Sequence, residues 1–352
     1  MKINFVIPFS NLTGGIKVIF EYCNRLKEFG HEINIYVPMK AYKFNNSGIS
    51  GFFKTLRSSI GNTFIRGKKV KWFNLNCKIK LVPHITDRYI EDADICVATA
   101  WPTAYDVEKL CESKGKKVYF IQGYEIWSGN KEEVETSYKL RLNQIVITKS
   151  LKNIMNNKFK KNATIIYNGI DKNDMYFDNK ISCKDIVISI MYHELEIKGF
   201  KDGVSAIELV REKYPQIRVK AFGTKRGEDI PDYIEFYENP TREELKQIYI
   251  DSDIYVFPSR SEGWGLTVIE AMACKCAVAG TNTGAISEIA TDYKDCLISE
   301  PMDIKALSQN IIKLIENDSL RNDISKNAFD LASRFEWNKS VKKMEEFFRK
   351  IL

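Results

Sequence analysis

Apolar residues form short, nearly continuous runs that alternate with stretches of helical periodicity. In the first half of the chain these runs lie at residues 2–8, 32–38, 94–100, 117–121, 144–148 and 164–167. Residues 16–29, between the first two runs, carry apolar side chains at helical spacing. Continuous apolar strands that alternate with helices are typical of parallel sheets covered on both faces. The pattern therefore predicts a doubly wound α/β domain in this half.

A second series of the same kind begins after a polar stretch at 172–184. Its apolar runs lie at 186–191, 217–222, 233–237, 253–257 and 276–279. A length of 352 residues favours two domains over one. We therefore predict an N-terminal domain over 1–172 and a C-terminal domain over 173–337. A last helical stretch, within 338–352, is expected to pack back on the N-terminal domain.

A loop with two carboxylates and two glycines follows the predicted strand at 253–257. It reads SEGWGLTVIE over residues 261–270. In open parallel sheets, ligands bind beyond the carboxyl ends of the strands, where loops lead into helices. Gly263 and Gly265 would let the backbone approach such a ligand closely, because a glycine has no side chain in the way. The loop is therefore a candidate ligand site.

The residues that follow these glycines allow two interpretations. The N–H groups of Leu266 and Thr267 would lie at the start of a helix, where a phosphate is favoured. Thr267 and Glu270 also have the spacing of a capping box, which needs no ligand, and for Glu270 alone the two interpretations are equally supported. Capping explains neither Glu262 nor the two glycines. A dinucleotide site is disfavoured, because the third glycine position of that fingerprint holds Val268.

The composition is that of a globular protein with a mild positive charge. The 53 Lys and Arg residues against 46 Asp and Glu give a formal net charge of +7. The eight Cys residues show neither CxxC pairs nor metal-type spacing with His. No apolar run approaches the roughly 20 residues of a membrane-spanning helix, and the first ten residues alternate like a strand and not like a signal sequence. We therefore expect a reduced, cytoplasmic protein with at most peripheral contact to a membrane.

A family resemblance extends across most of the chain. The stretch SEGWGLTVIEAMACKCAVAGTNTGAISEIA at 261–290 resembles the Glu-x7-Glu region of the retaining family-4 glycosyltransferases, with Glu262 and Glu270 at the two Glu positions. Further ordered matches, which leave out only about 39–80, include Gly14-Gly15, Asn168-Gly169-Ile170-Asp171, Lys198-Gly199, Thr241-Arg242-Glu243-Glu244-Leu245, Pro258-Ser259, Gly284, Glu288 and Phe335-Glu336-Trp337. Ordered matches across two domains are more specific than any one motif.

The resemblance implies the GT-B fold, in which two Rossmann-like, doubly wound parallel-sheet domains face a cleft. The C-terminal domain would bind a UDP-, GDP- or dTDP-linked sugar, and the N-terminal domain would bind the acceptor. Glu270 would hold the ribose hydroxyls, while Glu262 would face the donor sugar. The implied donor-binding residues are Gly14, Gly15, Lys198, Glu262, Gly263, Trp264, Gly265, Leu266, Thr267 and Glu270.

Such chemistry depends on neutralising the charge that develops on the leaving diphosphate. The family usually supplies an Arg and, five residues later, a Lys-Gly pair. Lys198 matches this pattern, whereas His193 stands where Arg is expected. A neutral His donates a hydrogen bond but carries no charge, so Lys225 and Arg226 are further candidates. The expected catalytic residues are Glu262, Lys198 and His193.

Residues elsewhere in the chain bear on acceptor binding and on the need for a metal ion. Gln122, Tyr124 and Glu125 come directly after the predicted strand at 117–121 and are expected to line the acceptor side. An ordinary loop would explain these residues nearly as well. No Asp-x-Asp pair lies in a loop that follows a strand, so we expect neither a metal ion nor a cofactor besides the donor.

The function implied by the resemblance is hexosyltransferase-type glycosyl transfer with retention. The acceptor would be a hydroxyl of a glycan or lipid-linked molecule, in the assembly of cell-surface polysaccharide or glycolipid. Two alternatives stay open. One is an isomerase or hydrolase that acts on the nucleotide-sugar with the same fold. The other is a non-catalytic nucleotide-sugar-binding subunit, which the departure at His193 permits.

The segment outside the resemblance is strongly basic. Residues 39–80 contain no Asp or Glu, and their basic residues are Lys40, Lys43, Lys54, Arg57, Arg66, Lys68, Lys69, Lys71, Lys78 and Lys80. Aromatic residues lie between them, and 51–60 has the pattern of a short amphipathic helix. Such a segment favours peripheral binding to anionic lipid at the inner face of the cell membrane. A solvated loop is the alternative, and nucleic-acid binding is not expected because no nucleic-acid motif is present.

Overall fold

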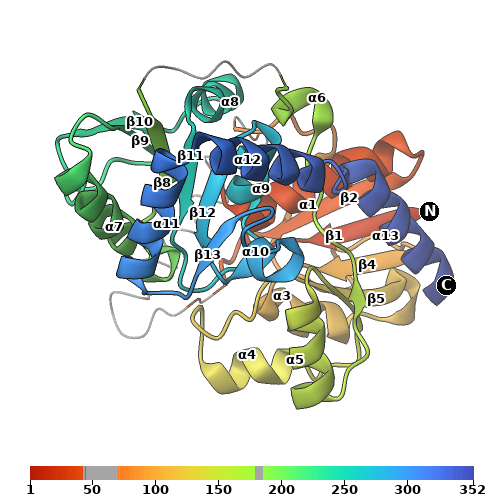
Figure 1. Ribbon diagram of the computed structural model, residues 1–352. Helices are drawn as coiled ribbons and strands as arrows, with labels where there is room; N and C mark the ends of the chain where they lie inside the picture. The colour runs from red at the N-terminus through yellow and green to blue at the C-terminus, as the bar shows by residue number, and fades with distance from the viewer. Residues whose placement is uncertain (43, 45–69, 71, 179–184) are drawn as a thin grey trace. The chain divides into compact units, whose positions relative to one another are not determined.

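The computed structural model describes residues 1–42, 44, 70, 72–178 and 185–352. Its contacts divide the chain into two compact units, one formed by 1–168 with 337–352 and the other by 169–336. Each unit is built on one parallel sheet connected by helices (Figure 1), as the alternating pattern predicts. The sequence placed the boundary between 172 and 173, whereas the contacts divide the chain between 168 and 169.

The first unit contains a seven-stranded sheet in the order β3-β2-β1-β4-β5-β6-β7. The strands are β1 (Lys2–Val6), β2 (Glu32–Pro38), β3 (Lys78–Val82), β4 (Ile95–Ala98), β5 (Lys116–Ile121), β6 (Asn143–Val146) and β7 (Thr164–Ile165). The helices are α1 (Gly14–Glu28), α3 (Trp101–Lys109), the short 3-10 helix η2 (Glu112–Lys114), α4 (Lys131–Ser137), α5 (Lys149–Phe159) and α13 (Trp337–Ile351). The order of the strands reverses between β1 and β4, which makes their carboxyl ends the switch point of this sheet.

The second unit contains a six-stranded sheet in the order β10-β9-β8-β11-β12-β13. The strands are β8 (Val187–Met191), β9 (Arg218–Gly223), β10 (Ile234–Glu238), β11 (Ile254–Phe257), β12 (Ala277–Thr281) and β13 (Leu297–Ser299). The helices are α6 (Lys172–Met175), η3 (Glu196–Lys198), α7 (Phe200–Lys213), α8 (Arg242–Asp251), α9 (Leu266–Ala273), α10 (Gly284–Ile289), α11 (Ile304–Glu316) and α12 (Asp318–Ala332). Here the order reverses between β8 and β11, so the loops that follow these two strands meet at the switch point.

Two strands escaped the sequence-based prediction. In β3, Lys78 and Lys80 alternate with apolar residues, and none of its first four residues is fully buried. β13 is only three residues long, Leu297–Ser299. Both strands lie at an edge of their sheet, where burial on both faces is not required and the continuous apolar signal of a central parallel strand is weaker.

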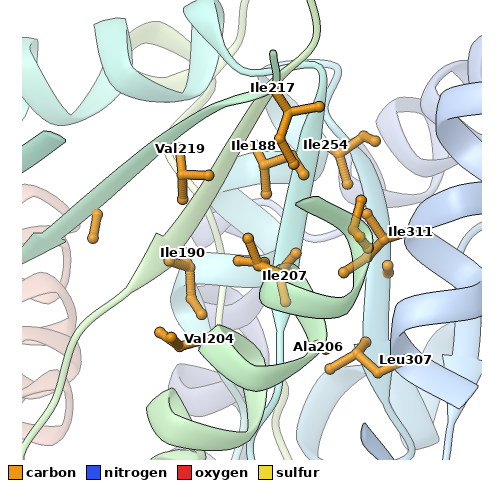
Figure 2. Packing of buried hydrophobic residues seen from close by; sticks show 14 of the residues in the cluster. Ile188, Ile190, Val204, Ala206, Ile207, Ile217, Val219, Ile254, Leu307 and Ile311 are labelled. Carbon is orange, nitrogen blue, oxygen red and sulfur yellow. The ribbon is translucent and has the colours of Figure 1, made fainter. Parts of the chain in front are cut away.

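A packed apolar core holds α7 and α11 against one face of the second sheet. Figure 2 shows Ile207 of α7 and Ile311 of α11 among Ile188 and Ile190 of β8 and Ile254 of β11. All five side chains are fully buried. Because burial of apolar surface stabilises by roughly 25 cal/mol per Å², this core fixes β8 and β11, and with them the positions from which their loops depart.

The C-terminal helix belongs to the first unit. α13 packs against α1, where the Trp337 ring meets the buried Tyr22 ring edge-on at a centroid distance of 5.2 Å. Val341, Met344 and Phe348, at helical spacing, are fully buried. The chain therefore enters the second unit and returns to the first with its last helix.

Candidate functional site

An ion pair joins the two loops at the switch point of the second sheet. The Nζ atom of Lys198, at the end of η3, lies 2.6 Å from Oε2 of Glu262 in the loop between β11 and α9. The two side chains are 20% and 13% exposed. The backbone also ties these loops, since the Arg260 N–H donates to the Ile197 carbonyl at 2.8 Å. Two of the predicted catalytic residues, 64 positions apart in the chain, are therefore brought together.

The close approach of the loops depends on Gly199. Its φ angle of +67° lies in the left-handed region, and a Cβ atom there would lie 2.0 Å from the Pro258 carbonyl oxygen. No L-residue with a side chain fits that distance without moving one of the loops. The Lys-Gly pair thus has a structural reason: the glycine admits the neighbouring loop and the lysine pairs with its carboxylate.

A second ion pair, which the sequence did not predict, ties the same loops. Arg260 contacts the Asp202 carboxylate through two bonds, Nε to Oδ2 at 2.7 Å and the second guanidinium nitrogen to Oδ1 at 2.9 Å. Asp202 lies in the first turn of α7 and is mostly buried. Such bidentate pairs hold geometry as well as charge. Arg260 therefore fixes the loop of Glu262 relative to the helix that follows Lys198.

Glu270 does not cap helix α9, and the capping-box interpretation is wrong. The helix begins at Leu266, and the residue at its N-cap is Gly265, with a φ angle of +87°. This left-handed glycine lets the helix start earlier than a Thr cap would, so Thr267 is the second helical residue. The first N–H groups of α9, at Leu266 and Thr267, have no partner within the helix and remain suited to an anion.

The Glu270 carboxylate lies inside the unit and has charged and polar partners. Glu270 is 4% exposed, and its Oε1 atom accepts a hydrogen bond of 2.6 Å from a terminal nitrogen of Arg242. Its Oε2 atom accepts one of 3.4 Å from the Tyr249 hydroxyl. Arg242 also forms an ion pair with Asp174. Sequence analysis assigned no role to Arg242, because its partners lie at distant positions and no local spacing connects them.

Trp264 and Gly263 shape the loop through backbone contacts. The Trp264 ring is almost fully buried and meets the Phe335 ring at a centroid distance of 5.6 Å. The Trp264 carbonyl accepts from the Ala285 N–H at 2.6 Å. The Gly263 N–H donates to Oε1 of Glu262 at 3.2 Å. Trp264 therefore anchors the loop with its side chain inside the unit, while Gly263 helps to orient Glu262.

His193 is exposed in the loop after β8 and has a defined tautomer. Its Nδ1 atom accepts the Leu195 N–H at 3.0 Å, so in the neutral ring the proton is on Nε2. Although His193 is exposed at the surface, neighbouring protein atoms partly desolvate its ring and lower its pKa, and the positive charge of Lys198 lowers the pKa further. His193 is therefore neutral near pH 7 and can donate one hydrogen bond without adding a charge.

The predicted N-terminal residues lie at the carboxyl edge of the first sheet. Gly14 and Gly15 begin α1, whose N-cap Thr13 accepts the Ile16 N–H at 3.2 Å. The Gln122 side chain, after β5, donates to the Gly15 carbonyl at 3.2 Å. The structure therefore brings Gly15 and Gln122 together at this edge.

Tyr124 and Glu125, from the same loop as Gln122, have different surroundings. The Tyr124 hydroxyl donates to Glu135 at 2.6 Å and accepts from Lys158 at 2.7 Å, so it is directed at α4 and α5. Burial raises the pKa of Glu125 to about 7, and the backbone N–H of Trp101, at the start of α3, opposes this rise.

The described residues contain neither a cluster of metal ligands nor a helix that could span a membrane. There, no three His, Cys, Asp or Glu side chains lie close enough together to hold a metal ion. Asp251 pairs with Lys220 at 2.7 Å, and Asp253 accepts the Val187 N–H at 2.9 Å. Among the same residues, no helix is both long and apolar enough to span a bilayer. Most of the basic segment 39–80, including 45–69, lies outside the described residues.

Solved structures share this fold along the whole chain. One is Anabaena HepE in complex with UDP-glucose, with a TM-score of 0.76, 14% identity, and coverage of 99% of this chain and 100% of that chain. Another is sucrose-phosphate synthase from Thermosynechococcus elongatus, with a TM-score of 0.74, 12% identity, and coverage of 100% and 99%. These likenesses show that the chain has the GT-B fold, and the predicted fold class is confirmed.

Sequence comparison gives a family match over the second unit alone. Residues 171–330, nearly the whole second unit, match the family of glycosyl transferases group 1. An uncharacterized glycosyltransferase of Methanocaldococcus jannaschii is 26% identical over 210 residues, which cover 59% of each chain. The capsular polysaccharide biosynthesis glycosyltransferase CapM of Staphylococcus aureus is 28% identical over 208 residues, 52% of this chain and 54% of that protein. The chain thus spans about half the length of these curated relatives. The family match over 171–330 includes Lys198, Glu262 and Glu270.

Proposed function

We propose that this chain is a retaining glycosyltransferase of family 4, which moves a sugar from a nucleotide-sugar to an acceptor hydroxyl. The observation that carries the proposal is the Lys198–Glu262 ion pair at the switch point of the unit that matches group 1 glycosyl transferases. Glu270 is buried in α9, the helix that follows the loop of Glu262, and this supports its place as the second Glu of the motif. The switch point thus presents a cation, a carboxylate and a helix N-terminus, and the second carboxylate belongs to that helix.

The leaving diphosphate is stabilised by groups that are already in place. The Lys198 ammonium and the N–H groups of Leu266 and Thr267 offset the negative charge that develops when the anomeric C–O bond breaks. On donor binding Lys198 turns from Glu262 to the diphosphate, and the released Glu262 carboxylate faces the sugar. His193, neutral with Nε2–H, donates a hydrogen bond where the family usually has an Arg. These groups supply the stabilisation without a metal ion or a cofactor.

The acceptor is bound by the first unit. Gln122 supplies an amide group at the carboxyl edge of its sheet, where it donates to the carbonyl of Gly15, one of the proposed donor-binding residues. Glu125 supplies a carboxyl group that changes charge near pH 7. Tyr124 contributes by fixing this loop to α4 and α5. A relative from Campylobacter jejuni, 26% identical over 180 residues, is named as an N-acetylgalactosaminyltransferase that acts on a diphospho-undecaprenol-linked sugar. This name and that of CapM support a glycan or lipid-linked acceptor and a role in polysaccharide or glycolipid assembly.

The same proposal includes the donor and the place of action. HepE is described as bound to UDP-glucose, which supports a nucleoside diphosphate sugar, with UDP, GDP and dTDP as the bases to test. The basic segment 39–80 is proposed to attach the protein to anionic lipid at the cytoplasmic face of the membrane. Vesicle sedimentation tests this, since binding should require anionic lipid and weaken as salt rises.

Product analysis by NMR, with candidate donors and a hydroxyl acceptor, tests the main proposal. An α-linked product from an α-linked donor is the expected result, because the proposed transfer retains configuration. Free sugar or an epimerised donor would identify a hydrolase or isomerase instead. An intact donor that nevertheless binds would identify a non-catalytic binding subunit.

A further inference from the structure

Arg242 occupies a position that helix electrostatics disfavours. It is the first residue of α8, where the N-terminal dipole repels a cation. The helix start is already fixed by a capping box, in which Thr241 accepts the Glu244 N–H at 3.2 Å and Glu244 accepts the Thr241 N–H at 2.8 Å. Arg242 therefore adds nothing to the helix start, and its contacts outside the helix must account for its place.

Those contacts are two carboxylates from other parts of the second unit. One terminal nitrogen of Arg242 lies 2.6 Å from Oε1 of Glu270, and Nε forms an ion pair with Asp174 of α6. Although burial opposes the charge on Arg242, Glu270 and Asp174 outweigh it and raise the pKa of the guanidinium. A planar guanidinium group that contacts carboxylates through two of its nitrogen atoms has little rotational freedom. Asp174 therefore fixes the direction in which Arg242 contacts Glu270.

Glu270 needs such a partner because its side chain is only 5% exposed. A buried carboxylate without a cation is strongly disfavoured. Its other oxygen accepts from the Tyr249 hydroxyl at 3.4 Å. Burial and the nearby Glu270 raise the pKa of Tyr249 well above its usual value, so this hydroxyl stays protonated and donates. The two contacts together set the plane of the carboxylate, and they are compatible with ribose hydroxyls because an ionised carboxylate accepts about four hydrogen bonds.

We propose that Arg242 is a positioning residue, which holds the Glu270 carboxylate in the orientation that binds both ribose hydroxyls of a nucleoside diphosphate. Arg242 would thereby set the preference of the site for a cis-diol over a sugar that lacks it. The inference rests on the proposed function, since it requires that Glu270 meets the ribose. Asp174 acts one step further away, through Arg242.

A purely structural role for Arg242 makes a different prediction. If Arg242 only stabilised the unit, its replacement would weaken the binding of every nucleotide by the same factor. If it orients Glu270, its replacement weakens UDP binding but leaves the binding of 2′,3′-dideoxy-UDP nearly unchanged. The ratio of the two dissociation constants separates these roles.

Isothermal titration calorimetry on the full chain measures this ratio, with UDP and 2′,3′-dideoxy-UDP as probes and the corresponding GDP pair where UDP does not bind. The unaltered protein is expected to prefer UDP by about tenfold or more, the effect of hydrogen bonds to a charged group. Arg242→Met should reduce the preference to less than about threefold. Arg242→Lys, which keeps the charge but loses the fork, and Asp174→Asn should give intermediate ratios.

Arg218→Met is the matched control. Arg218 lies on β9 of the same unit, is 60% exposed, and contacts Glu235 at 3.5 Å. It should keep the ratio of the unaltered protein. Melting temperatures identify any variant that fails to fold; if Arg242→Met does, the ratios of Arg242→Lys and Asp174→Asn decide.

The outcomes distinguish the inference from the proposal on which it rests. An unchanged ratio in the folded Arg242 variants, with equal losses for both nucleotides, would overturn the positioning role and leave glycosyl transfer intact. If the unaltered protein binds neither UDP, GDP nor dTDP, the proposed function fails, and the inference fails with it. Binding of dTDP alone, whose sugar lacks the 2′-hydroxyl, would overturn the inference and leave the proposed function intact. A ratio that falls only in the Arg242 and Asp174 variants supports the inference.

Discussion

The loops at the carboxyl edges of the two sheets use different forces. In the second unit, Lys198 with Glu262 and Arg242 with Glu270 are ion pairs between segments distant in the chain. In the first unit, Gln122 donates to a backbone carbonyl, and burial opposed by one backbone N–H sets the state of Glu125. The difference fits the proposed division of labour, in which one unit binds a charged diphosphate and a ribose while the other binds a neutral hydroxyl.

The strongest test of the charged side is Lys198. Lys198→Ala removes the cation proposed to meet the leaving diphosphate, and kcat should fall roughly a hundredfold or more. Steady-state kinetics measure it. Lys201→Ala is the control. Lys201 lies on α7, its side chain is 78% exposed, and its Nζ atom lies 3.7 Å from the carboxylate of Asp229. Full turnover in Lys198→Ala would mean that the diphosphate is held elsewhere, with Lys225 and Arg226 as the next candidates.

Replacements of Glu262 and Glu270 should affect different kinetic parameters. Glu270→Gln is expected to weaken donor binding about tenfold, because ribose contacts act alike on the ground state and the transition state. Glu262→Gln should mainly lower kcat, because contacts to a sugar that gains positive charge strengthen as it reacts. Donor KM and kcat, measured for both variants, decide. If KM and kcat of both variants equal those of the unaltered protein, the ion pairs of Glu262 and Glu270 have no role in the reaction.

Arg260 tests whether the charged site depends on loop geometry. Arg260→Met removes the bidentate contact with Asp202, and we expect kcat to fall about tenfold with the fold retained, since small misplacements of catalytic groups reduce rates strongly. Arg260→Lys keeps the charge without the fork and should lie between. Circular dichroism verifies folding, and rates equal to those of the unaltered protein would show that the backbone bonds and Gly199 suffice.

The sequence predicted the strand series except for the edge strands β3 and β13, and it predicted the residues of the two loops, but it did not predict the ion pairs that hold these loops. Alternation and helical spacing report contacts between near neighbours in the chain, whereas Arg242 and Glu270 are 28 positions apart and meet only after the sheet has formed. The capping box failed for a related reason. Gly265 adopts a left-handed backbone that starts α9 before Thr267, and a spacing rule contains no information on that angle.

The smallest expected effect concerns the uncharged side, at Glu125. Burial raises the pKa of Glu125 to about 7 in the folded protein, above its usual value of 4.5. The folded state therefore binds this proton more tightly than the unfolded state does, and stability contributed by the group is lost as pH rises from about 4.5 to about 7. Glu125→Gln stays neutral at every pH and retains an oxygen for the Trp101 N–H. The melting temperature of the variant minus that of the unaltered protein should therefore be larger at pH 8 than at pH 5.

Thermal unfolding of both proteins at the two pH values measures this difference. Because all other titratable groups are the same in both proteins, their contributions cancel. Glu135→Gln is a suitable control, because the Glu135 carboxylate pairs with Lys158 at 2.5 Å and that contact lowers the pKa of Glu135. For Glu135 the sign is reversed and the pH window is lower: the contact stabilises above the unfolded pKa of 4.5 and is lost only as pH falls below it. Its replacement should therefore cost nearly the same at pH 8 and at pH 5. A difference that changes with pH at Glu125 and stays constant at Glu135 would separate the effect of burial from that of pairing. A Glu125→Gln difference that does not change with pH would mean that Glu125 is ionised throughout, and the contrast between the charged and uncharged sites would lose its clearest example.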